Sequence, residues 1–187
     1  MPIVTLIAEN MPVLLPMQGR SSGVHISTII NDLCIRLGHY DPKEDFNQSQ
    51  LEIGNAFEWA IIERMSLNNP GRYIRPGELT VDGRHGTPDL FDMNVEAVDE
   101  FKCTWMSVKN GPGSKKFWKY ETQIKAYCHM VGWLVSHLHV LHLNGDYSFG
   151  RMSGPPMYRC YRYVFTQSEL TANWSMLMAH ANTLENK

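Results

Sequence analysis

The sequence predicts an α/β or α+β fold in which a central mixed β-sheet is flanked by helices. Two long segments, at about 49–65 and 115–131, carry apolar residues at helical spacing, and shorter segments alternate in the manner of strands. A chain that mixes helices and strands in this order buries its apolar faces by packing helices onto a sheet. The 187 residues are enough for one domain with a substantial core.

We expect this single domain, residues 1–187, to consist of three parts. An N-terminal helical segment covers residues 1–48, a central segment covers about 49–133, and strands with a final helix cover 134–187. No apolar run is long enough to cross a membrane, and the N-terminus lacks the basic start and long apolar stretch of a signal peptide. Scattered cysteines fit a reducing compartment, so the sequence favours a cytoplasmic protein with no membrane partner.

Caps and apolar spacing predict four helices. They cover residues 26–37, 49–65, 115–131 and 168–184. The second begins at the Ser-x-x-Glu capping box of Ser49, and the last begins at a cap on Ser168. Gly132 is a plausible stop for the third, because glycine readily adopts the left-handed backbone that ends helices.

The alternation of apolar and polar residues predicts the strands. A short apolar run after Asp89 and a strand that includes residues 97–103 are expected to form a hairpin in the centre of the sheet. A later strand covers 138–143, and the Asn-Gly pair that follows it is typical of a tight hairpin turn, with a return over 146–151. An aromatic-rich strand over 158–165 completes the sheet.

The most informative feature is a pair of carboxylates that the central hairpin would bring together. Asp89 ends a Gly-Thr-Pro turn, and Glu100 lies on the following strand. Residues two apart on a strand share a face, so Glu100 and Lys102 point one way while Phe101 and Cys103 point the other. If the two segments pair, Asp89 and Glu100 can meet over one cation.

These residue types suit a divalent metal and an attacking water. Mg²⁺ takes oxygen ligands and keeps several waters, so one or two carboxylates can seat it. A metal-bound water is a better nucleophile, and the metal neutralises charge that builds on a phosphate. Lys102 could orient that water or, with a lowered pKa, deprotonate it. The alternative interpretation is an ordinary Pro-Asp turn beside a solvated Glu-x-Lys strand edge.

A third carboxylate, Glu58, lies on the apolar face of the second helix. Gly54, Ile61, Ile62 and Met65 are spaced to share that face. A lone charge there is costly unless it is paired or bound to a metal. The sequence leaves both interpretations open, so that Glu58 is either a metal ligand or the partner of an arginine in a structural salt bridge.

The third helix carries a polar pair, Gln123 and Tyr127. These residues are four apart, so they are neighbours on the helix surface. Taken alone, such a pair usually marks the boundary between the buried and solvated faces of a helix.

Together these segments resemble the PD-(D/E)XK nuclease superfamily, and within it the branch of lambda exonuclease and the RecB-type nuclease domains. Four motifs match in order, namely a Gly-x-x-x-Glu helix, a Gly-x-Pro-Asp turn, a Glu-x-Lys strand and a Gln-x-x-x-Tyr helix, at residues 54–58, 86–89, 100–102 and 123–127. Glu58 favours the lambda-exonuclease side, because some RecB-type relatives carry a histidine there. The resemblance covers about half the chain and implies a restriction-endonuclease-like PD-(D/E)XK core.

The resemblance implies a role for each matching residue. Asp89, Glu100 and the main-chain carbonyl of Phe101 would bind the metal, and Glu58 would join them directly or through water. Lys102 would position the nucleophilic water. Gln123 and Tyr127, from the last motif, would brace the site or the DNA backbone. Ser27, in the opening helix, matches a serine of the family's opening segment and would contact the DNA.

Positive charge gathers beside this candidate site. The chain as a whole has a net charge of −2, yet residues 102–125 contain six lysines and one acid. A basic stretch next to a metal site can follow a phosphate backbone. The lysines expected to contact DNA are Lys109, Lys115, Lys116 and Lys119.

Other metal sites are not favoured by the sequence. Cys34, Cys103, Cys128 and Cys160 lack the close spacing of a cluster or zinc motif, so no iron–sulfur centre is expected. Three histidines, His137, His139 and His142, lie close together, but no acid or cysteine is spaced with them. We interpret them as residues of the sheet surface.

The resemblance thus implies a metal-dependent DNA exonuclease that hydrolyses phosphodiester bonds at DNA ends during phage-type recombination or repair. Mg²⁺ is the expected cofactor, and an oxygen site would also accept Mn²⁺. A single-strand annealing recombinase and further copies of the chain are possible partners besides DNA. Two alternatives stay open, namely a structure- or sequence-specific endonuclease and a non-catalytic DNA-binding protein that keeps the fold.

Overall fold

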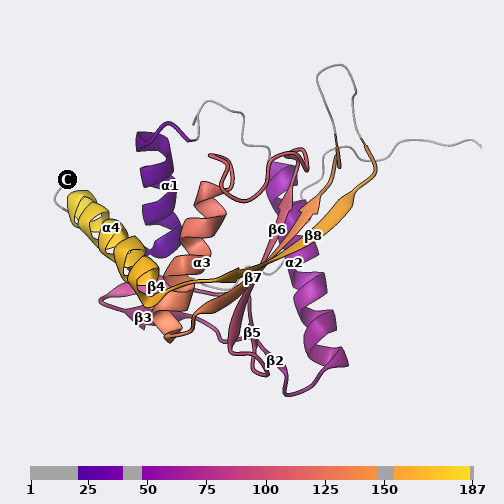
Figure 1. Cartoon of the computed structure of the whole chain (residues 1–187), viewed down its shortest axis with the longest axis horizontal. Helices are drawn as coiled ribbons and strands as arrows, with labels where there is room; N and C mark the ends of the chain where they lie inside the picture. Colours follow the sequence, from indigo (N-terminus) through magenta and orange to yellow (C-terminus); the bar gives the residue numbers. More distant parts are fainter. Residues whose placement is uncertain (1–20, 40–47, 147–153, 186–187) are drawn as a thin grey trace, which may run out of the picture.

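The structure of the protein, a computed structural model, describes residues 21–39, 48–146 and 154–185 (Figure 1). The helices are α1 (Ile26–Arg36), α2 (Gln48–Asn68), α3 (Trp118–Val131) and α4 (Gln167–Glu185). The strands are β1 (Val24–His25), β2 (Tyr73–Ile74), β3 (Leu79–Val81), β4 (Arg84–Gly86), β5 (Leu90–Asp92), β6 (Ala97–Thr104), β7 (Val135–His142) and β8 (Met157–Val164). None of the helices in these ranges is long and apolar enough to cross a membrane.

A five-stranded mixed sheet forms the centre, in the order β2-β5-β6-β7-β8. The central strands β6 and β7 run parallel along eight paired residues each, and every other neighbouring pair in this sheet is antiparallel. A parallel pair needs a long crossover, which α3 supplies here. A smaller sheet, in the order β1-β4-β3, lies beside it. The predicted mixed sheet with flanking helices is confirmed.

Helices cover both faces of the large sheet (Figure 1). On one face α1, α3 and α4 pack against one another and α3 packs on β6 and β7, with Ile29, Ile124 and Leu138 among the buried residues. On the other face α2 packs on β6, where Ile62 and Phe101 are buried together. Successive side chains of β6 point to opposite faces of the sheet, so they pack alternately against α3 and against α2.

The central hairpin forms as predicted. Strands β5 and β6 pair antiparallel, with Leu90 opposite Asp99 and Asp92 opposite Ala97. Val98 lies on the face covered by α3, whereas Phe101 lies on the face covered by α2.

Several predicted boundaries are wrong. Helix α3 begins at Trp118 rather than at residue 115, because Phe117 and Trp118 both donate to the carbonyl of Ser114 in a turn. Helix α4 is capped by Thr166, not Ser168. The Thr166 hydroxyl accepts the N–H of Glu169, and the Glu169 carboxylate accepts the N–H of Thr166, which is the reciprocal pair of a capping box.

Two further predictions need correction or fall outside the described residues. The strand that returns beside β7 is β8, with His142 opposite Met157, so the tight hairpin with a return over 146–151 is wrong. Most of that predicted return, residues 147–151, lies outside the described residues.

Helix α2 is described from Gln48, one residue before the predicted cap at Ser49, whose side chain is not described. At the C-terminal end of α3, Gly132 adopts a left-handed backbone and ends the helix, as predicted.

Candidate active site

The candidate site lies along the part of β6 that extends past the end of β5. Because β5 begins at Leu90 opposite Asp99, the residues of β6 beyond Asp99 have no strand partner on that side within the described residues. Asp89, the residue just before β5, occupies this edge. Its Oδ2 accepts the backbone N–H of Phe101 at 2.8 Å.

This bond also orients the carbonyl of Phe101. In a strand the N–H and the C=O of one residue point to the same side, which is why antiparallel partners exchange both bonds. The carbonyl of Phe101 is therefore directed to the edge where Asp89 lies. The side chain of Phe101 is fully buried and stacks on the ring of His139 with centroids 4.3 Å apart, which fixes this stretch of backbone.

Glu100 and Lys102 share one face of β6, as the alternation predicted. Lys102 Nζ donates to Glu100 Oε1 at 2.6 Å. The second oxygen, Oε2 of Glu100, is buried and has no hydrogen-bond partner among the described residues. Burial and the charge of Asp89 raise the pKa of Glu100 to about 8. An unpartnered buried carboxylate oxygen is costly, and a bound cation would relieve that cost.

Glu58 reaches the same place from α2. Its Oε1 lies 3.9 Å from Lys102 Nζ, and burial raises the pKa of Glu58 to about 7 against the opposing charge of Lys102. Helix α2 packs on β6 at Gly54, where a Cβ would make an ordinary contact at 3.8 Å with the Cβ of Cys103. The salt-bridge partner of Glu58 in the structure is thus Lys102, not the arginine that the sequence left open.

Lys102 is surrounded by negative charge. Burial lowers the pKa of Lys102, but the carboxylates of Glu100, Glu58 and Asp89 outweigh it and hold that pKa well above its ordinary value. The sequence left open whether Lys102 orients or deprotonates a water. Among these neighbours it is an ammonium group, which suits orientation.

The structure adds Arg75, a charged residue that the sequence did not single out. Burial raises the pKa of Asp89, and positive charge on Lys102, Arg75 and His139 opposes that rise. Arg75 is exposed, in the loop after β2. Only the folded arrangement brings it near Asp89, because its own sequence context is an unremarkable Ile-Arg-Pro.

Gln123 and Tyr127 are joined on α3. Gln123 Nε2 donates to Tyr127 Oη at 2.9 Å, and both side chains are buried. Tyr127 also touches the Gly-Thr-Pro-Asp turn, since a Cβ on Gly86 would lie 2.9 Å from Tyr127 Cε1 and 2.9 Å from Met130 Sδ. The glycine therefore lets the turn pack directly on α3, which places Asp89. The pair is buried, not at a boundary.

The predicted DNA-contacting lysines lie in different settings. Lys115 and Lys116 are exposed in the turn before α3. Lys119, on the first turn of α3, has its pKa lowered by partial burial and by the charge of Lys102, so it lies within electrostatic reach of that lysine. Lys109 pairs with Asp146 at 3.3 Å. Their role in binding DNA stays a prediction.

Ser27 is the second residue of α1 and is partly buried. Helix α1 packs against α3 and α4. The role of Ser27 also stays a prediction.

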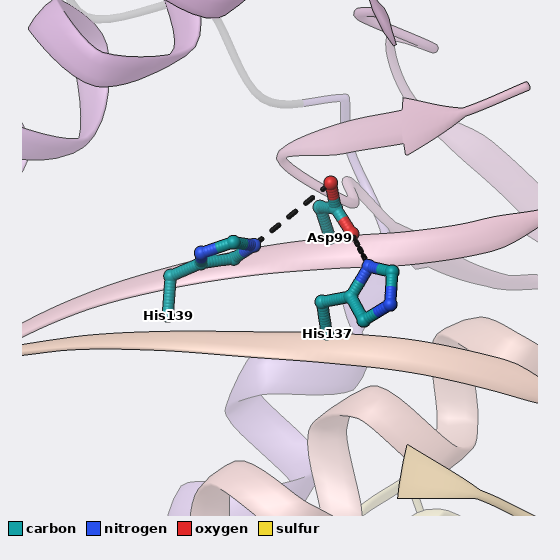
Figure 2. Close-up of side chains that lie close together, drawn as sticks. All are labelled: Asp99, His137 and His139. Carbon is teal, nitrogen blue, oxygen red and sulfur yellow. Dashed lines mark hydrogen bonds and ion pairs between the residues drawn. The ribbon is translucent and has the colours of Figure 1, made fainter. Parts of the chain in front are cut away.

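A second polar cluster corrects the interpretation of the histidines. Asp99 lies opposite His137 in the β6–β7 register, and Asp99 Oδ1 is 2.7 Å from His137 Nδ1. Asp99 Oδ2 is 3.9 Å from His139 Nε2 (Figure 2). Burial lowers the pKa of His139, but Asp99 and Cys160 raise it to about 9 overall. These histidines do have an acid partner, which the sequence hid because it lies on another strand. His142 faces Met106 instead.

The carboxylate group by the β6 edge fits a hard divalent cation. The available donors are oxygens from Glu58, Asp89, Glu100 and the carbonyl of Phe101, and Oε2 of Glu100 is buried with no hydrogen-bond partner in the part of the chain that the structure describes. The structure places Glu58, Asp89 and Glu100 around Lys102, and their role as metal ligands stays a prediction.

Neither a protein-family model nor a curated protein matches the sequence. Similar folds are found among solved structures. The alkaline exonuclease LHK-Exo from Laribacter hongkongensis matches with a TM-score of 0.55 and 16% identity over 88% of both chains. The same exonuclease in complex with dAMP gives a TM-score of 0.53 at 16% identity over 88% of both chains. A phage related exonuclease from Haemophilus somnus 129PT gives 0.51 at 13% identity, over 83% of this chain and 78% of that one.

These similarities establish the fold. The chain has the architecture of alkaline and phage-related exonucleases, as the sequence motifs implied, and at 13–16% identity the likeness concerns the fold alone.

Proposed function

We propose that the chain is a Mg²⁺-dependent deoxyribonuclease that hydrolyses phosphodiester bonds at DNA ends. The observation that carries this proposal is the convergence of Glu58, Asp89 and Glu100 on Lys102 at the free edge of β6. A mere DNA-binding protein has no use for three buried or half-buried carboxylates around one lysine, because such a group destabilises the fold and repels phosphates.

Asp89, Glu100 and the carbonyl of Phe101 would hold the cation, with Glu58 beside them. When bound, Mg²⁺ supplies charge neutralisation at the phosphate and lowers the pKa of its waters. The phosphate carries negative charge that the carboxylates alone would repel. Mn²⁺ has similar oxygen chemistry and is expected to substitute.

The remaining residues position the substrate and the attacking water. The ammonium of Lys102, held by Glu100 at 2.6 Å, can donate to a water or to a phosphate oxygen. Gln123 and Tyr127 support the turn that carries Asp89, and exposed Lys115 and Lys116 offer charge for the DNA backbone.

The similar folds support the proposal that the substrate is DNA and that digestion starts at DNA ends. The neighbours are exonucleases, and one was solved with dAMP, a mononucleotide of the kind that digestion from an end releases. A phage-type role in recombination or repair, alongside a single-strand annealing recombinase and as a homo-oligomer, fits that relationship. This part of the proposal rests on the resemblance and not on a contact in the chain.

Digestion of end-labelled linear duplex beside the same DNA as a closed circle tests the proposal. We expect loss of the linear DNA with Mg²⁺, protection of the circle, and no loss with a chelator. Cleavage of the circle would instead identify an endonuclease. No cleavage of duplex, single-stranded or branched DNA would leave a DNA-binding protein and would overturn the proposal.

A further inference from the structure

Four side chains from three strands meet on the face of β6 opposite Glu100. Asp99 of β6 lies opposite His137 of β7, and His139 of β7 lies opposite Cys160 of β8. Because Asp99 and Glu100 are consecutive on a strand, their side chains point to opposite faces of the sheet. The cluster therefore lies on the face of the sheet opposite Glu100 and Lys102, although the charge of His139 still reaches Asp89.

Three of these groups are spaced like ligands of a single ion, because Asp99, His137 and His139 each offer one ligand atom and these atoms all lie within 4.8 Å of one another. Asp99 Oδ2 lies 3.9 Å from His139 Nε2, and Cys160 Sγ lies 4.0 Å from the same nitrogen. Ligands bound to zinc at about 2.0–2.3 Å lie roughly 3.3–3.7 Å from one another around a tetrahedron. Both separations need to shorten by only a few tenths of an ångström, while the 2.7 Å contact of His137 Nδ1 with Asp99 must lengthen by about 0.6 Å. Cys160 lies outside the group of three and would turn its thiol toward Asp99 and His137 to become the fourth ligand.

The surroundings orient these atoms. Figure 2 shows Asp99 with one carboxylate oxygen directed to each imidazole. The other ring nitrogen of His139, Nδ1, is hydrogen-bonded to the hydroxyl of Tyr158, so Nε2 is left to face Asp99 and Cys160. Metal-binding histidines are commonly fixed in this way through their second nitrogen. Asp99 is 1% exposed and His139 is 7% exposed, whereas Cys160 is exposed and leaves the cluster open to solvent on one side.

The mixture of donors selects the class of metal. Imidazole and thiolate ligands favour zinc and similar transition-metal ions, whereas Mg²⁺ prefers oxygen. One carboxylate, two imidazoles and one thiol thus form a donor set unlike that of the proposed nuclease site.

We propose that Asp99, His137, His139 and Cys160 form a second metal site, specific for Zn²⁺ or a related transition-metal ion. The ion would cross-link β6, β7 and β8 from the face opposite Glu100. It would thereby stiffen the strand that carries Glu100 and Lys102. This inference does not depend on the proposed nuclease activity.

Titration of the full chain with Co²⁺, in a large excess of Mg²⁺, tests the site. Excess Mg²⁺ occupies oxygen sites, and tetrahedral Co²⁺ with nitrogen and sulfur ligands absorbs strongly in the visible range, unlike Co²⁺ among oxygens. We expect one equivalent of Co²⁺ to develop this absorption together with a thiolate-to-cobalt charge-transfer band, and Zn²⁺ to displace it. Absence of both features in the wild-type protein would overturn the proposal.

Variants distinguish ligation from adventitious binding. Cys160→Ser, at an exposed position, should fold and should lose the charge-transfer band, whereas Cys34→Ser should keep it. His137→Gln should weaken binding at least about 100-fold, and Tyr158→Phe about 10- to 100-fold, since the latter removes only the support of His139. Unchanged Co²⁺ spectra in both Cys160→Ser and His137→Gln would contradict the assigned ligands, and circular dichroism of each variant verifies its fold.

Discussion

The carboxylate of Asp89 takes the place of a strand beside Phe101. Its Oδ2 accepts the Phe101 N–H at 2.8 Å, just before β5 begins at Leu90. One side chain therefore satisfies a sheet edge and faces the carboxylates of Glu100 and Glu58. This double role lets substitutions at Asp89 separate stability from catalysis.

Asp89→Asn is expected to abolish cleavage while the fold survives. The amide oxygen can still accept the Phe101 N–H, but a neutral amide is a weak ligand for Mg²⁺, so cleavage should fall by about 1000-fold or more. Asp89→Ala also removes the acceptor and should be less stable than Asp89→Asn by about 1–3 kcal/mol. Initial rates and thermal melts check both statements. An active Asp89→Asn protein would exclude Asp89 as a required ligand.

Glu100→Gln should lose activity yet be as stable as the wild type, or more stable, in a chelator. The pKa of Glu100 is raised to about 8 in the folded protein. The folded state therefore holds a proton that the unfolded state releases between about pH 4.5 and pH 8, and wild-type stability falls as pH rises through that window. Glutamine does not titrate and removes this dependence. The stability of Glu100→Gln relative to the wild type should therefore increase from low to high pH.

Melting curves at several pH values, with chelator and then with Mg²⁺, check this prediction. Mg²⁺ should raise the melting temperature of the wild type but not of Glu100→Gln. If Glu100→Gln were much less stable than the wild type at about pH 8 in chelator, the ionised Glu100 carboxylate would stabilise the fold. That result would contradict the prediction that its buried charge destabilises the fold.

Mg²⁺ binding is expected to strengthen as pH rises. The pKa of Glu58 is raised to about 7 and that of Glu100 to about 8, so protons compete with the metal near neutral pH. Below about pH 7 the apparent affinity should fall by roughly 10-fold or more per pH unit. Isothermal titration calorimetry across this range measures it. An affinity independent of pH would mean that these carboxylates do not bind the ion.

Gly86→Ala tests the support that α3 gives to the Asp89 turn. A Cβ would lie 2.9 Å from both Tyr127 and Met130, closer than real contacts allow. We expect a loss of stability of about 1–3 kcal/mol from overpacking and a displaced turn with reduced cleavage. Gly111→Ala is the matched control, because its Cβ would make an ordinary contact at 3.9 Å with Tyr161. Equal behaviour of the two variants would contradict the packing argument.

Local signals predicted much of the fold and of the candidate site. The face shared by Glu100 and Lys102 follows from the two-residue period of a strand, and the position of Glu58 follows from the helical period around Gly54 and Ile62. The repeat of a strand or of a helix depends only on residues within that element, so both can be recognised from the sequence without the tertiary structure.

What the sequence could not predict depends on contacts between distant elements. Asp99 and His137 are 38 residues apart, and only the parallel register of β6 and β7 pairs them. The raised pKa of Lys102 likewise depends on three carboxylates from separate segments. The cap of α4 was misplaced because Thr166 and Ser168 are both suitable capping residues, and the partner Glu169 decides between them.

The central claim is tested most directly by comparing Lys102→Ala with Glu63→Gln in digestion of end-labelled linear duplex with Mg²⁺. Glu63 is exposed on α2, five residues after Glu58, so its variant controls for a charge change on that helix. We predict that Lys102→Ala folds but cleaves at least about 1000-fold more slowly, while Glu63→Gln cleaves like the wild type. Wild-type cleavage by a folded Lys102→Ala protein would contradict the account of the site.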